Sequence, residues 1–247
     1  MTVSVPRERV EEARAAMIEL FPEGFEEREG GGEIALTAYT EREDAVARLE
    51  PFGRVSESPV ALGWEDAWRS FHKPVRIGPL WIGPPWETAD AGSLPIVIDP
   101  GQAFGTGAHA TTRLCIELLL GVEPSGLVDL GCGSGVVAVA AAKLGFAPVL
   151  ALDNDELAVE AACVNAARNE VAVEARGADV LADALPQVAV AVANIARAPV
   201  ERATERFAGR LVIASGYLEA ERPEPSGWRS AERRVAEGWA ADLLVRD

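Results

Sequence analysis

The chain has 247 residues, of which 49% are hydrophobic and 25% are charged, and it carries a net charge of −16. This composition predicts a globular protein that is long enough to bury a sizeable core. The charge disfavours nucleic acid and anionic membranes as partners, and it leaves two explanations, solubility alone or a basic protein partner. The N-terminal residues lack the apolar core of a signal peptide and no apolar run reaches the length of a membrane span, so we expect a soluble, cytoplasmic protein.

The cysteine and histidine content argues against a metal centre. The three cysteines, Cys115, Cys132 and Cys163, lack the paired spacing of zinc sites, and the chain has only two histidines. We therefore expect reduced structural thiols and no bound metal.

Residues 1–55 are predicted to form a small α+β domain. The order of its elements is β-α-β-β-α, which is similar to a split βαβ unit. Apolar residues recur with helical spacing over residues 7–20, and three glycines separate the two strands of a hairpin. The predicted strands are 2–5, 25–29 and 34–39, and the predicted helices are 7–20 and 41–49.

Residues 56–94 form a predicted linker region that is rich in proline, glycine and tryptophan. Trp64 and Trp68 have the spacing of one helix face, and we favour packing between two units over a substrate pocket as their role. Residues 75–77 and 80–82 indicate either a pair of strands or one kinked strand.

From residue 95 to residue 247, predicted strands and helices alternate, which indicates a parallel, doubly wound α/β sheet. The end of the chain differs, because residues 233–246 predict a β-hairpin. An antiparallel final pair is typical of class I S-adenosylmethionine-dependent methyltransferases, which have a Rossmann-like seven-stranded sheet, and not of nicotinamide-binding domains. The predicted strands are 96–98, 127–130, 149–152, one before Gly177, 188–193 and 211–214, and the predicted helices are 111–120, 134–144, 155–169 and 199–207.

A glycine-rich loop follows the strand at 127–130. Gly131, Gly133 and Gly135 let a ligand approach the backbone, and the next helix, predicted to start at about Ser134, points its free N–H groups at the loop. The G-x-G-x-x-A spacing also satisfies the dinucleotide fingerprint, so a nicotinamide cofactor remains an alternative. The carboxylate of Asp129 would repel a pyrophosphate but suits a cationic methionine amino group, which favours S-adenosylmethionine.

Other polar residues follow the ends of the predicted strands. Asp153 is expected to accept hydrogen bonds from a ribose diol, with Asn154 beside it, while Asp155 is available to cap the next helix. Asp179 has two equally weighted roles, an adenine contact or a turn. Asn194 ends the fourth strand, where ligands of open α/β sheets bind, and is expected to contact both the cofactor and the incoming nucleophile.

A second glycine-rich segment spans residues 99–112, with the sequence DPGQAFGTGAHATT. We expect it to cover the methionine end of the cofactor, with Thr111 or Thr112 as the cap of the following helix. Phe104 and Thr106 are predicted cofactor contacts, as is Thr112. His109 has two explanations, a contact with the substrate or packing of the loop, and we favour packing.

Together these motifs resemble the PrmA family, the bacterial methyltransferases of the large-subunit ribosomal protein eleven. The signature D/E-P-G-x-A-F-G-T-G-x-H-x-T-T is matched by residues 99–112, and residues 63–69, the loop at 129–136 and Ala193-Asn194-Ile195 are similar to the family as well. The resemblance is good from about residue 60 onward and only architectural over the first 55 residues, where the family recognises its protein substrate. Residues 110 and 196–198 depart from the family pattern.

The resemblance implies S-adenosylmethionine as cofactor, with contacts at Thr112, Gly131, Asp153 and Asn194. It also implies N-methylation of lysine side chains or the N-terminal amine of a basic ribosomal protein. Alternatives are another protein lysine, a small-molecule substrate, a nicotinamide-dependent oxidoreductase, or a binding module without activity. We further expect a monomer with no direct contact to nucleic acid or membrane.

Overall fold

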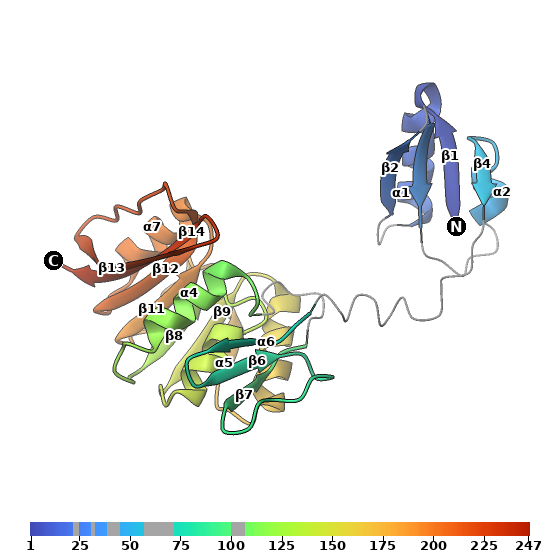
Figure 1. Ribbon diagram of the computed structural model, residues 1–247. Helices are drawn as coiled ribbons and strands as arrows, with labels where there is room; N and C mark the ends of the chain where they lie inside the picture. The colour runs from blue at the N-terminus through green and yellow to red at the C-terminus, as the bar shows by residue number, and fades with distance from the viewer. Residues whose placement is uncertain (22–24, 31–32, 39–44, 57–71, 100–106) are drawn as a thin grey trace. The chain divides into compact units, whose positions relative to one another are not determined.

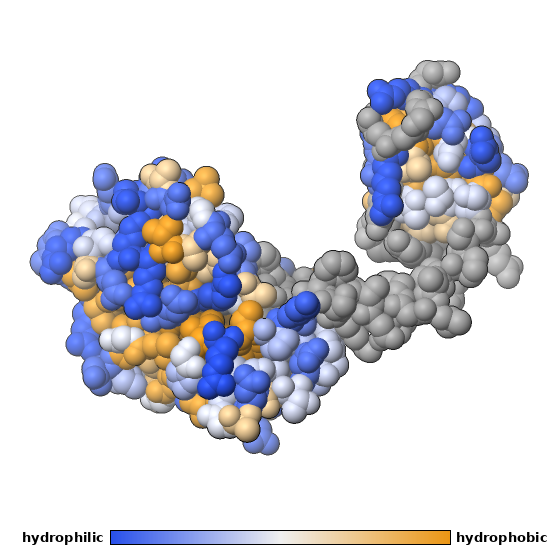
Figure 2. All heavy atoms as spheres, in the orientation of Figure 1, coloured by the Kyte–Doolittle hydropathy of each residue, from blue (hydrophilic) through white to orange (hydrophobic). Residues whose placement is uncertain are grey.

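The computed structural model describes residues 1–21, 25–30, 33–38, 45–56, 72–99 and 107–247 (Figure 1). The chain divides into two compact units, residues 1–68 and 69–247. The predicted helix face at Trp64 and Trp68, and the predicted cofactor contacts Phe104 and Thr106, lie outside the described residues. Figure 2 shows hydrophilic side chains over much of the visible face of each unit, interrupted by smaller apolar areas.

The first unit contains a four-stranded antiparallel sheet in the order β2-β3-β1-β4. Alternate residues of β1 and β3, such as Val3 and Leu36, are buried against apolar residues of α1 and α2, including Met17 and Leu49. The short strand β4 was not predicted from the sequence. The elements are β1 (Thr2–Pro6), η1 (Arg7–Arg9), α1 (Val10–Leu20), β2 (Glu26–Gly30), β3 (Glu33–Thr37), α2 (Ala45–Leu49) and β4 (Arg54–Ser56).

The second unit is built on a seven-stranded sheet in the order β10-β9-β8-β11-β12-β14-β13. The first five strands in this order are parallel to one another. β14 pairs antiparallel with β12 on one side and with β13 on the other, which confirms the predicted methyltransferase-type sheet with a terminal hairpin. The strands are β8 (Leu127–Leu130), β9 (Val149–Asp153), β10 (Glu174–Gly177), β11 (Val190–Asn194), β12 (Leu211–Leu218), β13 (Trp228–Ala236) and β14 (Trp239–Arg246).

Helices cover both faces of this sheet because its strands alternate their side chains between the faces. Ala151 and Val192 belong to the core cluster that includes α4, α5 and α6, whereas Leu152 and Ala193 belong to the cluster with α7. The helices are α4 (Ala110–Leu119), α5 (Val136–Lys143), α6 (Glu156–Arg168) and α7 (Arg197–Arg206). Helix α5 therefore starts two residues later than the predicted Ser134.

A separate three-stranded sheet contains β5 (Val75–Ile77), β6 (Leu80–Gly83) and β7 (Leu94–Val97). Strands β5 and β6 form an antiparallel pair, and β7 runs parallel to β6. The prediction that residues 96–98 belong to the main sheet is therefore wrong. The sequence correctly indicated a strand here, observed as β7. Its pairing partner, however, is β6, which lies in the segment that was expected to be a linker.

Candidate active site

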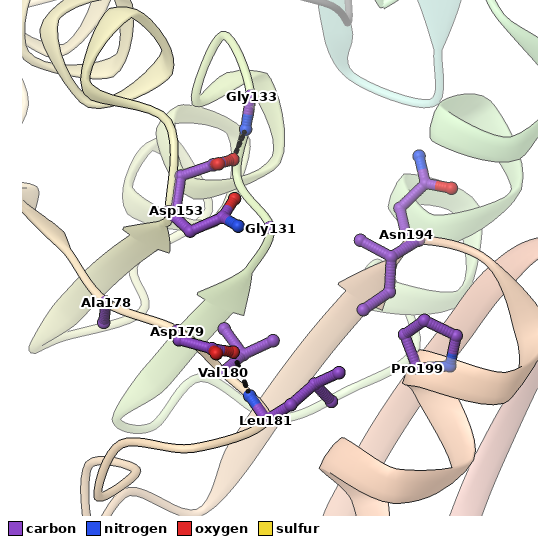
Figure 3. Close-up of a pocket in the computed structure, with 11 residues that line it drawn as sticks. Gly131, Gly133, Asp153, Ala178, Asp179, Val180, Leu181, Asn194 and Pro199 are labelled. Carbon is purple, nitrogen blue, oxygen red and sulfur yellow. Dashed lines mark hydrogen bonds between the residues drawn. The ribbon is translucent and has the colours of Figure 1, made fainter.

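The carboxyl ends of the parallel strands bring the predicted site residues to one edge of the sheet. The strand order reverses between β8 and β11, and such a switch point creates a crevice outside the strand ends. A cavity of about 370 Å³ lies there (Figure 3). It is lined by Gly131, Gly133, Asp153, Asn154, Ala178, Asp179, Val180, Leu181, Asn194, Ile195 and Pro199.

The Asp153 carboxylate ends β9 and is fixed by two backbone donors. The N–H of Gly133 donates to Oδ2 at 2.9 Å, as Figure 3 shows, and the N–H of Asp155 donates to Oδ1 at 3.1 Å. The side chain of Asp155 accepts from the N–H of Leu157 and is the N-cap of α6, as its position suggested. Asp153 is thus not needed as the helix cap, and its oxygens are oriented at the rim of the cavity.

The glycines of the loop have backbone conformations that other residues rarely adopt. Gly131, Gly133 and Gly135 have φ values of +76°, +51° and +75°. A Cβ on Gly131 would lie 2.5 Å from Cγ2 of Ile195, so a side chain there would collide with the wall of the cavity. Gly135 is the N-cap of α5, where a Cβ would meet Ala162 at 2.8 Å.

A second, smaller cavity of about 30 Å³ lies beside the first and shares Gly131, Gly133 and Asn194 with it. Its other lining residues include the buried side chains Thr112 and Asp129. The side-chain amide of Asn194 donates to Oγ1 of Thr112 at 3.3 Å. This bond connects the end of β11 with the first turn of α4 and turns the amide oxygen of Asn194 away from Thr112.

The Asp129 carboxyl group is almost completely buried. Burial raises its pKa to about 7, and the nearby Asp153 charge acts in the same direction, while the N–H of Ala138, which donates to Oδ2 at 3.2 Å, acts against this. A carboxyl group in such a site takes up negative charge most readily when a cation lies next to it. The position therefore suits the ammonium group that the sequence analysis assigned to it.

Asp179 forms the turn that was one of its two predicted roles, and His109 has contacts within the protein. Asp179 lines the larger cavity and accepts from the N–H of Leu181 at 2.8 Å, which forms a turn. His109, and not Thr111 or Thr112, is the N-cap of α4, because its ring accepts from the N–H of Thr111. The His109 ring also contacts Trp239 edge to face, with 5.1 Å between the ring centroids.

The sequence analysis missed the apolar wall of the larger cavity. Four apolar residues line it: Ile195 directly after β11, Val180 and Leu181 in the turn after β10, and Pro199 in the first turn of α7. Short apolar residues at such positions look the same in a sequence whether they line a cavity or fill the core. Among the described residues, no group of three or more His, Cys, Asp or Glu is placed to bind a metal ion, and no helix has the length and apolarity needed to cross a membrane.

The cavity and its fixed carboxylate lie on a fold that known proteins share. The crystal structure of ribosomal protein L11 methylase from Lactobacillus delbrueckii subsp. bulgaricus superposes with a TM-score of 0.63 at 29% identity, covering 70% of this chain and 98% of that chain.

The chain is also similar in sequence to curated ribosomal protein L11 methyltransferases. The protein from Shewanella pealeana is 40% identical over 79% of this chain and 70% of its own length. The protein from Pelotomaculum thermopropionicum is 46% identical over 63% of this chain and 54% of its own length. The chain thus spans between about half and 70% of the length of these relatives. The family model of ribosomal protein L11 methyltransferase (PrmA) matches residues 11–228. The chain therefore belongs to the ribosomal protein L11 methyltransferase (PrmA) family, as the motifs predicted.

Proposed function

We propose that this protein is an S-adenosylmethionine-dependent methyltransferase that modifies lysine side chains or the N-terminal amine of ribosomal protein L11. The observation that carries the proposal is the cavity at the switch point, with the Asp153 carboxylate at its rim and Asn194 at its junction with the smaller cavity. Family membership supports the same reaction. We further propose that the protein acts in the cytoplasm as a monomer without direct contact to nucleic acid.

The residues of the two cavities fit the proposed cofactor. The side-chain-free surfaces of Gly131 and Gly133 leave space beside an oriented Asp153 carboxylate, which suits a ribose diol as donor. The apolar residues Val180 and Leu181 suit the faces of an adenine ring. Asp129, at the smaller cavity, would balance an ammonium group.

When bound, the cofactor would supply a methyl group on a positively charged sulfur. Its transfer to a neutral amine would form an N–C bond as the S–C bond breaks, and S-adenosylhomocysteine would be the leaving group. A lysine amine has a pKa of about 10.4 in water and must lose its proton to water first. Removal of water around the amine favours its neutral form. The Asn194 amide is held by Thr112, so its carbonyl oxygen is free to accept a hydrogen bond from the amine and to orient the nitrogen lone pair.

The test is calorimetric titration of the protein with S-adenosylhomocysteine. We expect binding that Asp153→Ala weakens at least about tenfold, a loss of about 1.4 kcal/mol, because the ribose hydroxyls and the N–H of Gly133 both lose their acceptor. Asp155→Ala is the matched control, since it removes the N-cap of α6 only. It should lower stability by about 1 kcal/mol and leave the affinity almost unchanged.

The second half of the test is the methyl acceptor. The protein should transfer methyl groups to purified L11, detected by mass spectrometry, and should fail to do so with an unrelated basic protein. Absence of binding to S-adenosylhomocysteine would refute the proposed cofactor. Binding without methylation of L11 would refute the proposed substrate and leave the cofactor assignment in place.

A further inference from the structure

Two buried asparagines, Asn165 and Asn169, lie one turn apart on α6 and at its end, and neither was singled out by the sequence analysis. Asn165 is 2% exposed and Asn169 is 5% exposed. Asparagine is a poor helix former, and a buried amide is costly unless its donors and acceptor are bonded. The bonds that these amides form therefore indicate why they occupy this face of the helix.

The side chain of Asn165 joins two separate parts of the candidate site. Its Nδ2 donates to the carbonyl oxygen of Ser134 at 2.9 Å, and its Oδ1 accepts from the N–H of Asp99 at 3.3 Å. Ser134 is the buried residue between Gly133 and Gly135 in the glycine-rich loop. Asp99 is the first residue of the second motif, residues 99–112.

The glycine-rich loop depends on contacts from outside for its shape. Gly133 and Gly135 both have positive φ values, and residues without a Cβ can adopt many other conformations. Helix α6 supplies two contacts behind the loop, the Asn165 bond to Ser134 and the close packing of Ala162 against Gly135. In the same loop, the N–H of Gly133 donates to Asp153 (Figure 3).

We propose that Asn165 is a positioning residue that fixes the glycine-rich loop, and through Gly133 the Asp153 carboxylate, in the conformation that binds the cofactor. This role rests on the proposed function, because its benefit is cofactor affinity. Asn169 provides the contrast. Its side-chain amide accepts from the N–H of Val97 and donates to the Val97 carbonyl oxygen, both at 2.7 Å, and it donates to the backbone carbonyl oxygen of Asn165 at 2.8 Å. All three partners lie on β7 or α6, and none lies in the glycine-rich loop.

The experiment compares Asn165→Ala with Asn169→Ala in the full chain. Asn169→Ala removes three side-chain hydrogen bonds and Asn165→Ala removes two, so we expect Asn169→Ala to lower the unfolding midpoint at least as much. Affinity for S-adenosylhomocysteine, measured by calorimetry below the unfolding midpoint, should fall at least about tenfold in Asn165→Ala and less than about threefold in Asn169→Ala.

A second measurement needs no ligand. Hydrogen exchange of the Gly133 amide, followed by NMR, should be faster in Asn165→Ala than in Asn169→Ala, because only Asn165 supports the loop that presents this amide to Asp153. If Asn165→Ala does not fold, Asn165→Leu and Asn169→Leu keep the side-chain volume and test the same bonds.

Equal losses of affinity in the two variants, or an unchanged affinity in Asn165→Ala, would overturn the positioning role. So would an unchanged exchange rate of the Gly133 amide. If the wild-type protein did not bind S-adenosylhomocysteine at all, the proposed function would fail, and the exchange measurement would still decide whether Asn165 fixes the loop.

Discussion

At the scale of single residues, Asp129 links folding stability to pH. Its carboxyl group has an ordinary pKa of 3.8 and a pKa of about 7 in the folded protein because it is buried. The folded protein therefore binds this proton more tightly than the unfolded chain does. The stability that depends on the group is fully present below about pH 4 and is lost as the pH rises toward 7.

We predict that Asp129→Asn is more stable than the wild type at about pH 8, by on the order of 1 to 4 kcal/mol, and equally stable near pH 4. The neutral amide has a similar shape and can still accept from Ala138, but it has no ionised form to bury. Urea unfolding at the two pH values is the measurement. Affinity for S-adenosylhomocysteine should fall, since a neutral side chain cannot balance an ammonium group. A difference in stability that did not depend on pH would contradict this account.

Asn194 allows a separation of chemistry from binding. Asn194→Ala should lower the rate of methyl transfer about a hundredfold and weaken S-adenosylhomocysteine less than about tenfold, because the lost carbonyl oxygen acts on the incoming amine. Thr112→Val is the companion variant. It keeps the Asn194 side chain but removes its partner, so the rate should fall by a smaller factor. Steady-state kinetics and calorimetry together measure both effects, and an unchanged rate in Asn194→Ala would rule out the orienting role.

The sequence predicted the position of single residues well where a general rule of the fold applied to them. Asp153 and Asn194 are the last residues of β9 and β11, and the ends of parallel strands meet at one edge of the sheet. No such rule covered Asn165, whose partner Ser134 lies 31 residues away in the chain. The available signal was Asn165 inside the predicted helix 155–169, because asparagine is unfavourable within a helix without a partner.

At the scale of secondary structure, an irregularity in β12 supports the end of β11. The pairing of β12 with β14 shifts between Ser215 and Tyr217, and Gly216 at this bulge has a φ of +98°. A Cβ on Gly216 would lie 1.9 Å from the carbonyl oxygen of Ile195. Since Ile195 lines the larger cavity and follows Asn194, this close backbone contact sets one wall of the site.

Gly216→Ala should therefore damage both folding and binding. We compare it with Gly238→Ala, at a glycine that also has a positive φ, +79°, but has no atom within 4 Å of the added Cβ. The control should lose about 1 kcal/mol of unfolding free energy from backbone strain alone. Gly216→Ala should lose at least about 2 kcal/mol more and bind S-adenosylhomocysteine more weakly. Similar losses in unfolding experiments on the two variants would show that the contact with Ile195 is unimportant.

Elements with a clear periodicity were predicted within a few residues, and so were the two hairpins, whereas the pairing of β7 was not. The residues of β7 have the composition of a strand, but nothing in them distinguishes a place in the main sheet from a place beside β6. β4 has only three residues and was missed for lack of any period. The cap of α4 was misplaced because a histidine ring, which is an uncommon N-cap, took the position expected for a threonine.

At the scale of the whole molecule, each unit has its own apolar core. The first unit packs α1 and α2 on one face of its sheet, and the second unit has core clusters on both faces of its sheet. Separate cores allow units to fold independently. We propose that the first unit recognises the protein substrate and that the second unit carries out catalysis, as the resemblance to the PrmA family implies.

A chain of residues 69–247 should consequently fold and bind S-adenosylhomocysteine with an affinity within about threefold of the full chain. Methylation of L11 at low substrate concentration should fall at least about tenfold, because part of the protein-binding surface is lost. Calorimetry and a methylation assay on both chains are the measurements. Undiminished methylation of L11 would show that the first unit does not recognise this substrate.

The hydrogen bonds between α6 and β7 also affect the tendency of the protein to aggregate. Strand β7 is the edge of the three-stranded sheet. The N–H groups of Leu94 and Ile98 donate toward β6, so the backbone groups of the alternate residues, Pro95, Val97 and Asp99, face away from β6. Proline has no N–H, and the N–H groups of Val97 and Asp99 are bonded to Asn169 and Asn165. This edge offers no free donor to an incoming strand, so edge-to-edge aggregation is blocked here by two side-chain amides.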